Sequence, residues 1–209
     1  RGFESEIAPI AWSDWLRTIG GRPMTPILEL IQKGADELLR GAQDSKQLTV
    51  LAHSAGGWIA RLWMGEDEYC GKRYDQAHRV DRLVTLGTPH DSIDSLTIEN
   101  MSFVNQHYPG AYHKDVKYVS IAGSGCTPDD ESVRFDVFRR RAQCLAYWSY
   151  RVTHGCGCQP GDGIIPLSVT NLEGADHIVL PDVWHSFDSA GPWYGDDHVI
   201  DQWIHHLRS

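Results

Sequence analysis

Apolar runs separated by polar or glycine-containing stretches divide the chain into short strands and longer helical segments. Runs that contain β-branched residues predict strands at residues 47–52, 80–86, 116–122 and 177–180, and residues 5–10 can form one more short strand. The run at 47–52 is almost continuously apolar, which is typical of a strand buried on both faces. The sequence therefore predicts a sheet of several short strands.

Helical spacing of apolar residues occurs between and after these strands. Residues 26–40 follow this spacing, with Thr25 as the expected N-cap and Gly41 as the stop. A second helix is expected over residues 55–65. A last helix, 196–208, places on one face Val199, Ile200, Trp203, Ile204 and Leu207. Strands that alternate with helices predict an α/β fold with a layered, largely parallel sheet.

Residues 124–160 break this alternation. They carry glycines, cysteines, aspartates and a cluster of three arginines at 139–141, with no clear strand. A long excursion of this kind is typical of a lid or cap over a binding site. Because no linker divides the chain, we expect a single domain over residues 1–209, with 124–160 inserted as the cap.

Composition narrows the range of functions. The 209 residues carry a formal net charge of −9, which disfavours nucleic acid and anionic lipid as partners on average. No apolar run approaches the roughly 18–20 residues of a membrane span. The chain has five cysteines, an odd number, so a full disulfide framework is not indicated. The cysteines therefore do not identify the cellular compartment of the protein.

The residues with the clearest chemical signal lie where the 47–52 strand meets the following helix. The sequence there, Ala52–Gly57, reads AHSAGG. A serine at the apex of a sharp strand-to-helix turn raises its hydroxyl above the sheet, provided that the residues two before and two after are small. Ala52 and Gly56 are small, although glycine is usual at both places. The alternative for Ser54 is a helix N-cap followed by a glycine turn.

A nucleophilic serine requires a base and an orienting acid further along the chain. Asp162 lies in the glycine-flanked stretch GDGIIP, where an aspartate could also be a simple turn former. Among eleven histidines, His185 follows the last predicted strand, at the sheet edge where functional groups gather. Other histidines lie on the final helix, where surface and capping roles are the default.

Together with AHSAGG, two further motifs make the chain resemble an α/β-hydrolase of the lipase-like group. LGTPH at 86–90 is similar to a strand-end motif of many lipases, and GDGIIP at 161–166 is similar to their acid loop. The stretch 193–207 resembles a subgroup found in plants, algae and cyanobacteria, often targeted to chloroplasts and related to inositol-deacylating lipases. The resemblance implies an α/β-hydrolase fold with a mostly parallel sheet flanked by helices.

Carried over to these positions, the resemblance implies a serine esterase or lipase that acts on an apolar ester without a cofactor or a metal. Ser54 would be the nucleophile, Asp162 the orienting acid and His185 the base. The backbone N–H of Ala55 would stabilise the oxyanion, and His53 and Trp184 are expected beside the reacting groups. Transient contact with a membrane surface is compatible with such a substrate.

The second oxyanion donor is expected to be missing. In this fold it comes from the loop after the third strand, which should precede residues 5–10 in the sequence, and no such loop is present before Arg1. In the sheet of this fold, the third strand lies between the strands predicted at 5–10 and 47–52. We therefore expect an N-terminally truncated chain. Two alternatives to an esterase stay open. One is a non-catalytic ligand-binding protein of the same fold, or an inactive fragment. The other is a metal-binding module built on HGCGC at 154–158, whose C-x-C spacing lacks a second cysteine pair.

Overall fold

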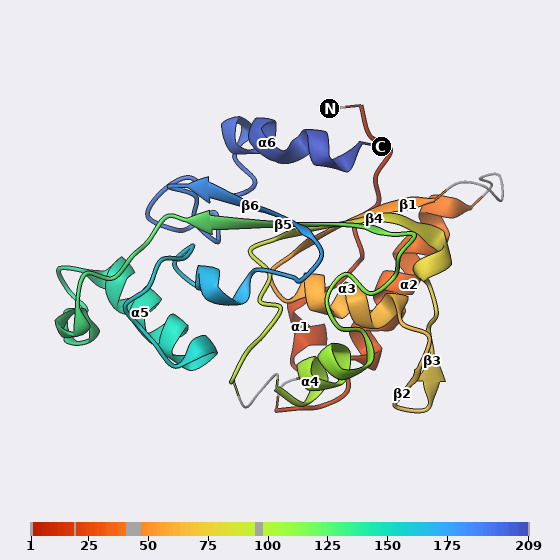
Figure 1. The fold of residues 1–209 in the computed structure, drawn as a ribbon, viewed down its shortest axis with the longest axis horizontal. Helices are drawn as coiled ribbons and strands as arrows, with labels where there is room; N and C mark the ends of the chain where they lie inside the picture. Colours follow the sequence, from red (N-terminus) through yellow and green to blue (C-terminus); the bar gives the residue numbers. More distant parts are fainter. Residues whose placement is uncertain (1, 19, 41–46, 95–97, 209) are drawn as a thin grey trace.

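A four-stranded parallel sheet forms the centre of the molecule (Figure 1). The computed structural model describes residues 2–18, 20–40, 47–94 and 98–208. The strand order is β1-β4-β5-β6. The strands are β1 (Leu48–His53), β4 (Val80–Leu86), β5 (Lys117–Ser124) and β6 (Asp176–Pro181). The prediction of a largely parallel sheet is therefore confirmed.

Helices lie on both faces of this sheet, and in Figure 1 α6 lies above it while α1 to α4 lie below. The α-helices are α1 (Trp12–Trp15), α2 (Thr25–Leu39), α3 (Gly56–Met64), α4 (Ile98–His107), α5 (Arg141–His154) and α6 (Asp197–Trp203). The 3-10 turns are η1 (Ala77–Arg79), η2 (Glu131–Phe135), η3 (Leu167–Val169) and η4 (Ile204–Leu207). A small hairpin joins β2 (Glu68–Tyr69) to β3 (Lys72–Arg73).

The two faces of the sheet belong to two separate apolar cores. Leu83 on β4 is paired with Tyr118 on β5, and both side chains join the core shared with α2, α3 and α4. The next pair, Val84 and Val119, joins the core under α6, which includes Trp203. Successive side chains of a strand point to opposite faces of the sheet, so the central strands β4 and β5 each contribute residues to both cores. This burial on both faces explains the nearly continuous apolar runs in the sequence.

All four strands run in the same direction, so their carboxyl ends meet at one edge of the sheet. The paired ends are His53 with Leu86, and Leu86 with Ile121. Ser124 and Pro181 end β5 and β6 at the same edge. Loops that follow parallel strands collect at this edge, which is where α/β proteins bind ligands.

Two predictions near the N-terminal part of the chain are wrong. Residues 5–10 form no strand: Pro9 lacks a backbone N–H, Ile7 is 85% exposed, and Ala8 lies against Gly34 of α2 instead of the sheet. The N-cap of α2 is Met24 and not Thr25, which is already helical. The stop expected at Gly41 lies outside the described residues.

The burial predicted for β1 is also wrong. Within the described part of the sheet, β1 is an edge strand with β4 as its neighbour, and Leu51 is 45% exposed. The prediction of a missing strand and a truncated chain is not tested by this arrangement. The helices expected after β1 and at the end of the chain are present as α3 and as α6 with η4.

The excursion at 124–160 contains a helix that the sequence pattern did not reveal. In α5, the buried Cys144 and Tyr147 share the helix with the exposed Leu145 and Trp148. Apolar residues therefore occur on both sides of α5, and no single apolar face marks it as a helix. None of the described helices has the length and apolar character required to cross a membrane.

Replacement of Ile59 by alanine tests the packing of α3, the helix that follows the candidate nucleophile. Ile59 is 0% exposed and belongs to the larger core. We expect the free energy of unfolding to fall by about 2–5 kcal/mol in Ile59→Ala and by about 0.5–1.5 kcal/mol in Ile59→Val, measured by urea denaturation. Equal losses in the two variants would contradict the packing described.

Candidate active site

Ser54 lies at a sharp turn between β1 and α3, and its backbone is in the left-handed region with φ of 55°. This conformation is strained for a residue with a side chain. Two hydrogen bonds hold the turn: the Ser54 N–H donates to the Leu86 carbonyl (2.9 Å), and the Thr88 hydroxyl donates to the Ser54 carbonyl (2.7 Å). The sequence predicts a sharp strand-to-helix turn at Ser54, and the structure has one.

Small residues allow α3 to approach the sheet at this turn. A Cβ added to Gly56 would lie 3.6 Å from the Ala52 Cβ, which is an ordinary contact. A Cβ added to Gly57 would lie 2.3 Å from the Thr88 hydroxyl, which is impossible without movement. Sequence reasoning stressed Gly56, but the tighter steric requirement falls on Gly57.

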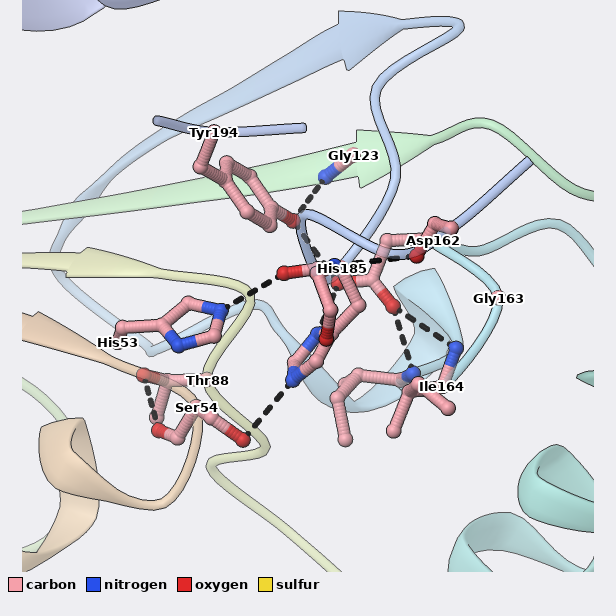
Figure 2. A network of polar contacts seen from close by, with 12 residues as sticks. His53, Ser54, Thr88, Gly123, Asp162, Gly163, Ile164, His185 and Tyr194 are labelled. Carbon is pink, nitrogen blue, oxygen red and sulfur yellow. Dashed lines mark hydrogen bonds and ion pairs between the residues drawn. The ribbon is translucent and has the colours of Figure 1, made fainter. Parts of the chain in front are cut away.

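The three residues predicted for the site come together at the carboxyl edge of the sheet (Figure 2). The His185 Nε2 lies 3.0 Å from the Ser54 Oγ, and the His185 Nδ1 lies 2.7 Å from the Asp162 Oδ2. Asp162 and His185 are 1% and 5% exposed, whereas Ser54 is partly exposed. The hydroxyl of a partly exposed serine, an imidazole and a buried carboxylate thus form a continuous chain of hydrogen bonds.

Four donors surround the Asp162 carboxylate. Its Oδ1 accepts the backbone N–H groups of Ile164 (3.1 Å) and Ile165 (2.7 Å). Its Oδ2 accepts the Tyr194 hydroxyl (2.9 Å) and lies against His185. The Asp162 carbonyl also accepts the backbone N–H of His185 (2.8 Å). Both carboxylate oxygens of this buried side chain therefore have hydrogen-bond partners.

Tyr194 belongs to the site, and sequence reasoning missed it. Its ring is 1% exposed, and its hydroxyl touches both Asp162 and the backbone N–H of Gly123 at the end of β5. Burial and the neighbouring Asp162 raise the pKa of Tyr194 well above its usual value, so the phenol keeps its proton. Tyr194 stands in no catalytic motif, and only the folded chain brings it to Asp162.

A second buried tyrosine supports the loop that carries Asp162. The Tyr150 hydroxyl accepts the backbone N–H of Gly163 (2.7 Å) and donates to the Cys126 carbonyl (3.1 Å). Burial raises the pKa of Tyr150. Through this contact α5 holds the acid loop in place.

Trp184 lies beside the loop that carries Asp162 and packs against neighbouring loops. Its ring fills the space next to Gly125, Gly163 and Gly191, where an added Cβ would approach it to 2.4–2.8 Å. It also packs against the small apolar cluster that includes Tyr150. The observed contacts of Trp184 are therefore with loops, and contact with a substrate stays a prediction.

His53, the last residue of β1, contacts His185. Its Nε2 donates to the His185 carbonyl (3.0 Å), and the two rings lie with their centroids 4.6 Å apart. One side of the His53 ring is open to solvent, while the other faces His185 and Tyr194. Desolvation, followed by the nearby His185, lowers the pKa of His53.

The backbone N–H of Ala55 is placed to stabilise an anion. Ala55 is the N-cap of α3, and its N–H donates to no acceptor within the described part of the chain. N–H groups at a helix N-terminus favour negative charge. This group is therefore available to an oxyanion formed next to the Ser54 Oγ.

The glycine of the GTPH stretch is required by the same network. Gly87 has φ of +55°, and an added Cβ would lie 2.6 Å from the Asp162 Oδ2 and 2.9 Å from the Tyr194 hydroxyl. His90, at the end of the stretch, is buried with its Nε2 3.4 Å from the Thr85 hydroxyl, and burial lowers its pKa to about 3. Of the LGTPH motif, three residues contact the site directly: Leu86 and Thr88 bond to the Ser54 backbone, and Gly87 lies against Asp162 and Tyr194.

The described residues include no group of three or more histidine, cysteine, aspartate or glutamate side chains that could hold a metal ion. All five cysteines are free, and the Cys156 Sγ lies 3.8 Å from the Cys158 carbonyl oxygen. The metal-binding alternative for HGCGC thus has no ligand cluster in its support.

Comparison with models of protein families and with curated proteins finds no match. Among solved structures, the chain is similar to that of a Bacillus licheniformis lipase, BlEst2, in its mature form. The TM-score is 0.52 and the sequence identity is 16%, and the similarity covers 90% of this chain and 75% of the lipase. At this identity the similarity shows the fold alone: the chain has an α/β-hydrolase fold, as predicted.

Replacement of Gly87 by alanine tests whether the site needs this close approach. Alanine at a left-handed position costs about 1–2 kcal/mol of stability. In Gly87→Ala the Asp162 and Tyr194 side chains must also move, so we expect a further loss of about 1–3 kcal/mol for the buried hydrogen bonds. Chemical denaturation measures both effects.

Gly71→Ala is the matched control for this prediction. Gly71 also has a positive φ, +81°, but an added Cβ meets nothing within 4 Å. We expect this variant to lose only the stability that alanine costs at a left-handed backbone position. If Gly71→Ala and Gly87→Ala are equally stable, the steric account of Gly87 is wrong.

Proposed function

We propose that the chain is a serine hydrolase that cleaves carboxylic esters through an acyl-enzyme intermediate. The observation that carries this proposal is the chain of hydrogen bonds from the Ser54 Oγ through His185 to Asp162, with distances of 3.0 and 2.7 Å. The strained, partly exposed serine and the α/β-hydrolase fold support it further.

In the proposed reaction, His185 accepts the proton of the Ser54 hydroxyl as the Oγ attacks the ester carbonyl. The Ala55 N–H stabilises the negative charge that develops on the carbonyl oxygen. The intermediate collapses with transfer of the proton from His185 to the leaving alcohol. Water, activated by His185 in the same way, then hydrolyses the acyl-enzyme and regenerates the Ser54 hydroxyl. Asp162 holds the His185 ring in the required tautomer throughout.

An apolar ester is the substrate class that the surroundings favour. Exposed apolar side chains lie two residues after Asp162 and two residues after His185, and others lie on α5, at the end of η2 and just after η2. They are Ile164, Phe187, Phe135, Val137, Phe138, Leu145, Trp148 and Val152. We propose that residues 124–160 act as the cap over this substrate, and that their apolar surface allows transient contact with lipid. Kinship with the plant, algal and cyanobacterial subgroup stays a prediction based on residues 193–207.

Labelling with a fluorophosphonate probe tests the proposed function. The probe reacts with a serine whose hydroxyl is activated by a base. We expect covalent labelling of the unmodified chain at Ser54, no labelling of Ser54→Ala, and unchanged labelling of Ser168→Ala, in which an exposed serine is removed. A folded chain that is not labelled would support a non-catalytic binding protein instead.

Hydrolysis of short p-nitrophenyl esters tests the role of the acid. In Asp162→Asn the amide can no longer hold His185 in the tautomer that accepts the serine proton. We expect kcat to fall by about 10⁴-fold, with a smaller change in KM. A fall of less than tenfold in a variant that stays folded would contradict the role assigned to Asp162.

A further inference from the structure

The hydrogen bonds of the Tyr194 hydroxyl have a direction that the chemistry of the groups fixes. The backbone N–H of Gly123 lies 2.6 Å from the phenolic oxygen and can only donate to it. The single phenolic proton is therefore left for the Asp162 Oδ2, 2.9 Å away, which as an ionised carboxylate can only accept. Figure 2 shows the hydroxyl between these two partners.

The Asp162 Oδ2 thus has two donors, His185 from one side and Tyr194 from the other. Because the proton of Tyr194 points at the same oxygen that faces the base, any change in this bond changes the charge that His185 experiences. Tyr194 has no contact with Ser54 among the interactions described, so it can act on the reaction only through Asp162.

We infer that Tyr194 is a positioning residue of the proposed hydrolase, which fixes the orientation of the Asp162 carboxylate and limits how strongly that carboxylate stabilises a positively charged His185. The inference rests on the proposed function. The hydroxyl draws part of the negative charge of Oδ2 toward itself, so His185 loses its acquired proton more readily to the leaving alcohol.

Few other groups near the Asp162 Oδ2 could change the charge that His185 experiences. The titratable side chains that face Asp162, His185 and Tyr194 are His53 from β1 and Tyr150 from α5. His53 bonds to the carbonyl of His185, and Tyr150 bonds to the backbone at Gly163 and Cys126. Neither donates to the Asp162 carboxylate.

Tyr194→Phe tests the inference, with Tyr150→Phe as the matched control. Both substitutions remove a buried hydroxyl that bonds to two separate segments near Asp162, but only the first removes a donor from the carboxylate. In Tyr194→Phe the unshared charge of Oδ2 stabilises protonated His185. We expect the acid limb of the kcat/KM profile to move upward by about 0.5–1 pH unit. At the optimum we expect kcat to fall about tenfold with KM unchanged, the rate equivalent of one lost hydrogen bond.

The protonation of His185 can also be followed without an activity measurement, by NMR titration of its ring against pH. The signal of this ring is assigned as the one that is missing in His185→Gln. We expect the midpoint to rise in Tyr194→Phe and to stay at the wild-type value in Tyr150→Phe. Site-specific replacement of Tyr194 by 3-fluorotyrosine keeps the hydroxyl and makes it a stronger donor, so the midpoint is expected to fall. This second variant decides the question if Tyr194→Phe does not fold.

Failure of the inference and failure of the proposed function are distinguishable. A wild-type chain without esterase activity contradicts the proposed function, while the NMR titration still tests the effect of Tyr194 on His185. An unchanged titration and pH profile in folded Tyr194→Phe overturn the inference, and so does an equal shift in Tyr150→Phe, which would indicate a merely structural role.

Discussion

The arrangement of the whole carboxyl edge depends on one buried carboxylate. Asp162 is 1% exposed, and an ion in such a place is tolerated only when donors surround it. The donors come from its own loop, from His185 after β6 and from Tyr194 before α6. Loops that are remote in the sequence are therefore tied together because each must help to satisfy the same charge.

This requirement also explains the glycines of the edge. Gly87 directly follows β4 and Gly123 is the penultimate residue of β5. A Cβ added to Gly87 would lie 2.6 Å from the Asp162 side chain, and one added to Gly123 would lie 3.1 Å from it. The carboxylate can approach the strand ends only because both positions lack a side chain. The Ser54 turn is bound to the end of β4 as well, through the Leu86 carbonyl. Strain in the serine backbone is thus balanced by bonds to the same edge that carries Asp162.

Local sequence patterns predicted most of the strands and helices and the three polar residues of the site, because these features require particular residue types at particular spacings. Strands buried on two faces read as apolar runs, and the turn at Ser54 needs small neighbours. The failures have equally physical causes. Residues 5–10 looked like a strand, yet Pro9 and the contact of Ala8 with α2 keep them out of the sheet. The helix α5 was not predicted because it has apolar residues on both its buried and its exposed sides.

Tyr194 shows where sequence reasoning ends. A hydrogen-bond donor to a buried acid needs only a hydroxyl at the right point in space, and many positions along the chain could deliver one. Its position is fixed by tertiary packing, since the Tyr194 ring lies in the core under α6 and its carbonyl accepts the Trp203 indole N–H (3.0 Å). The final helix therefore does more than cover the sheet. By anchoring Tyr194, it connects the packing of the C-terminal core to the Asp162 carboxylate, and through that carboxylate to His185.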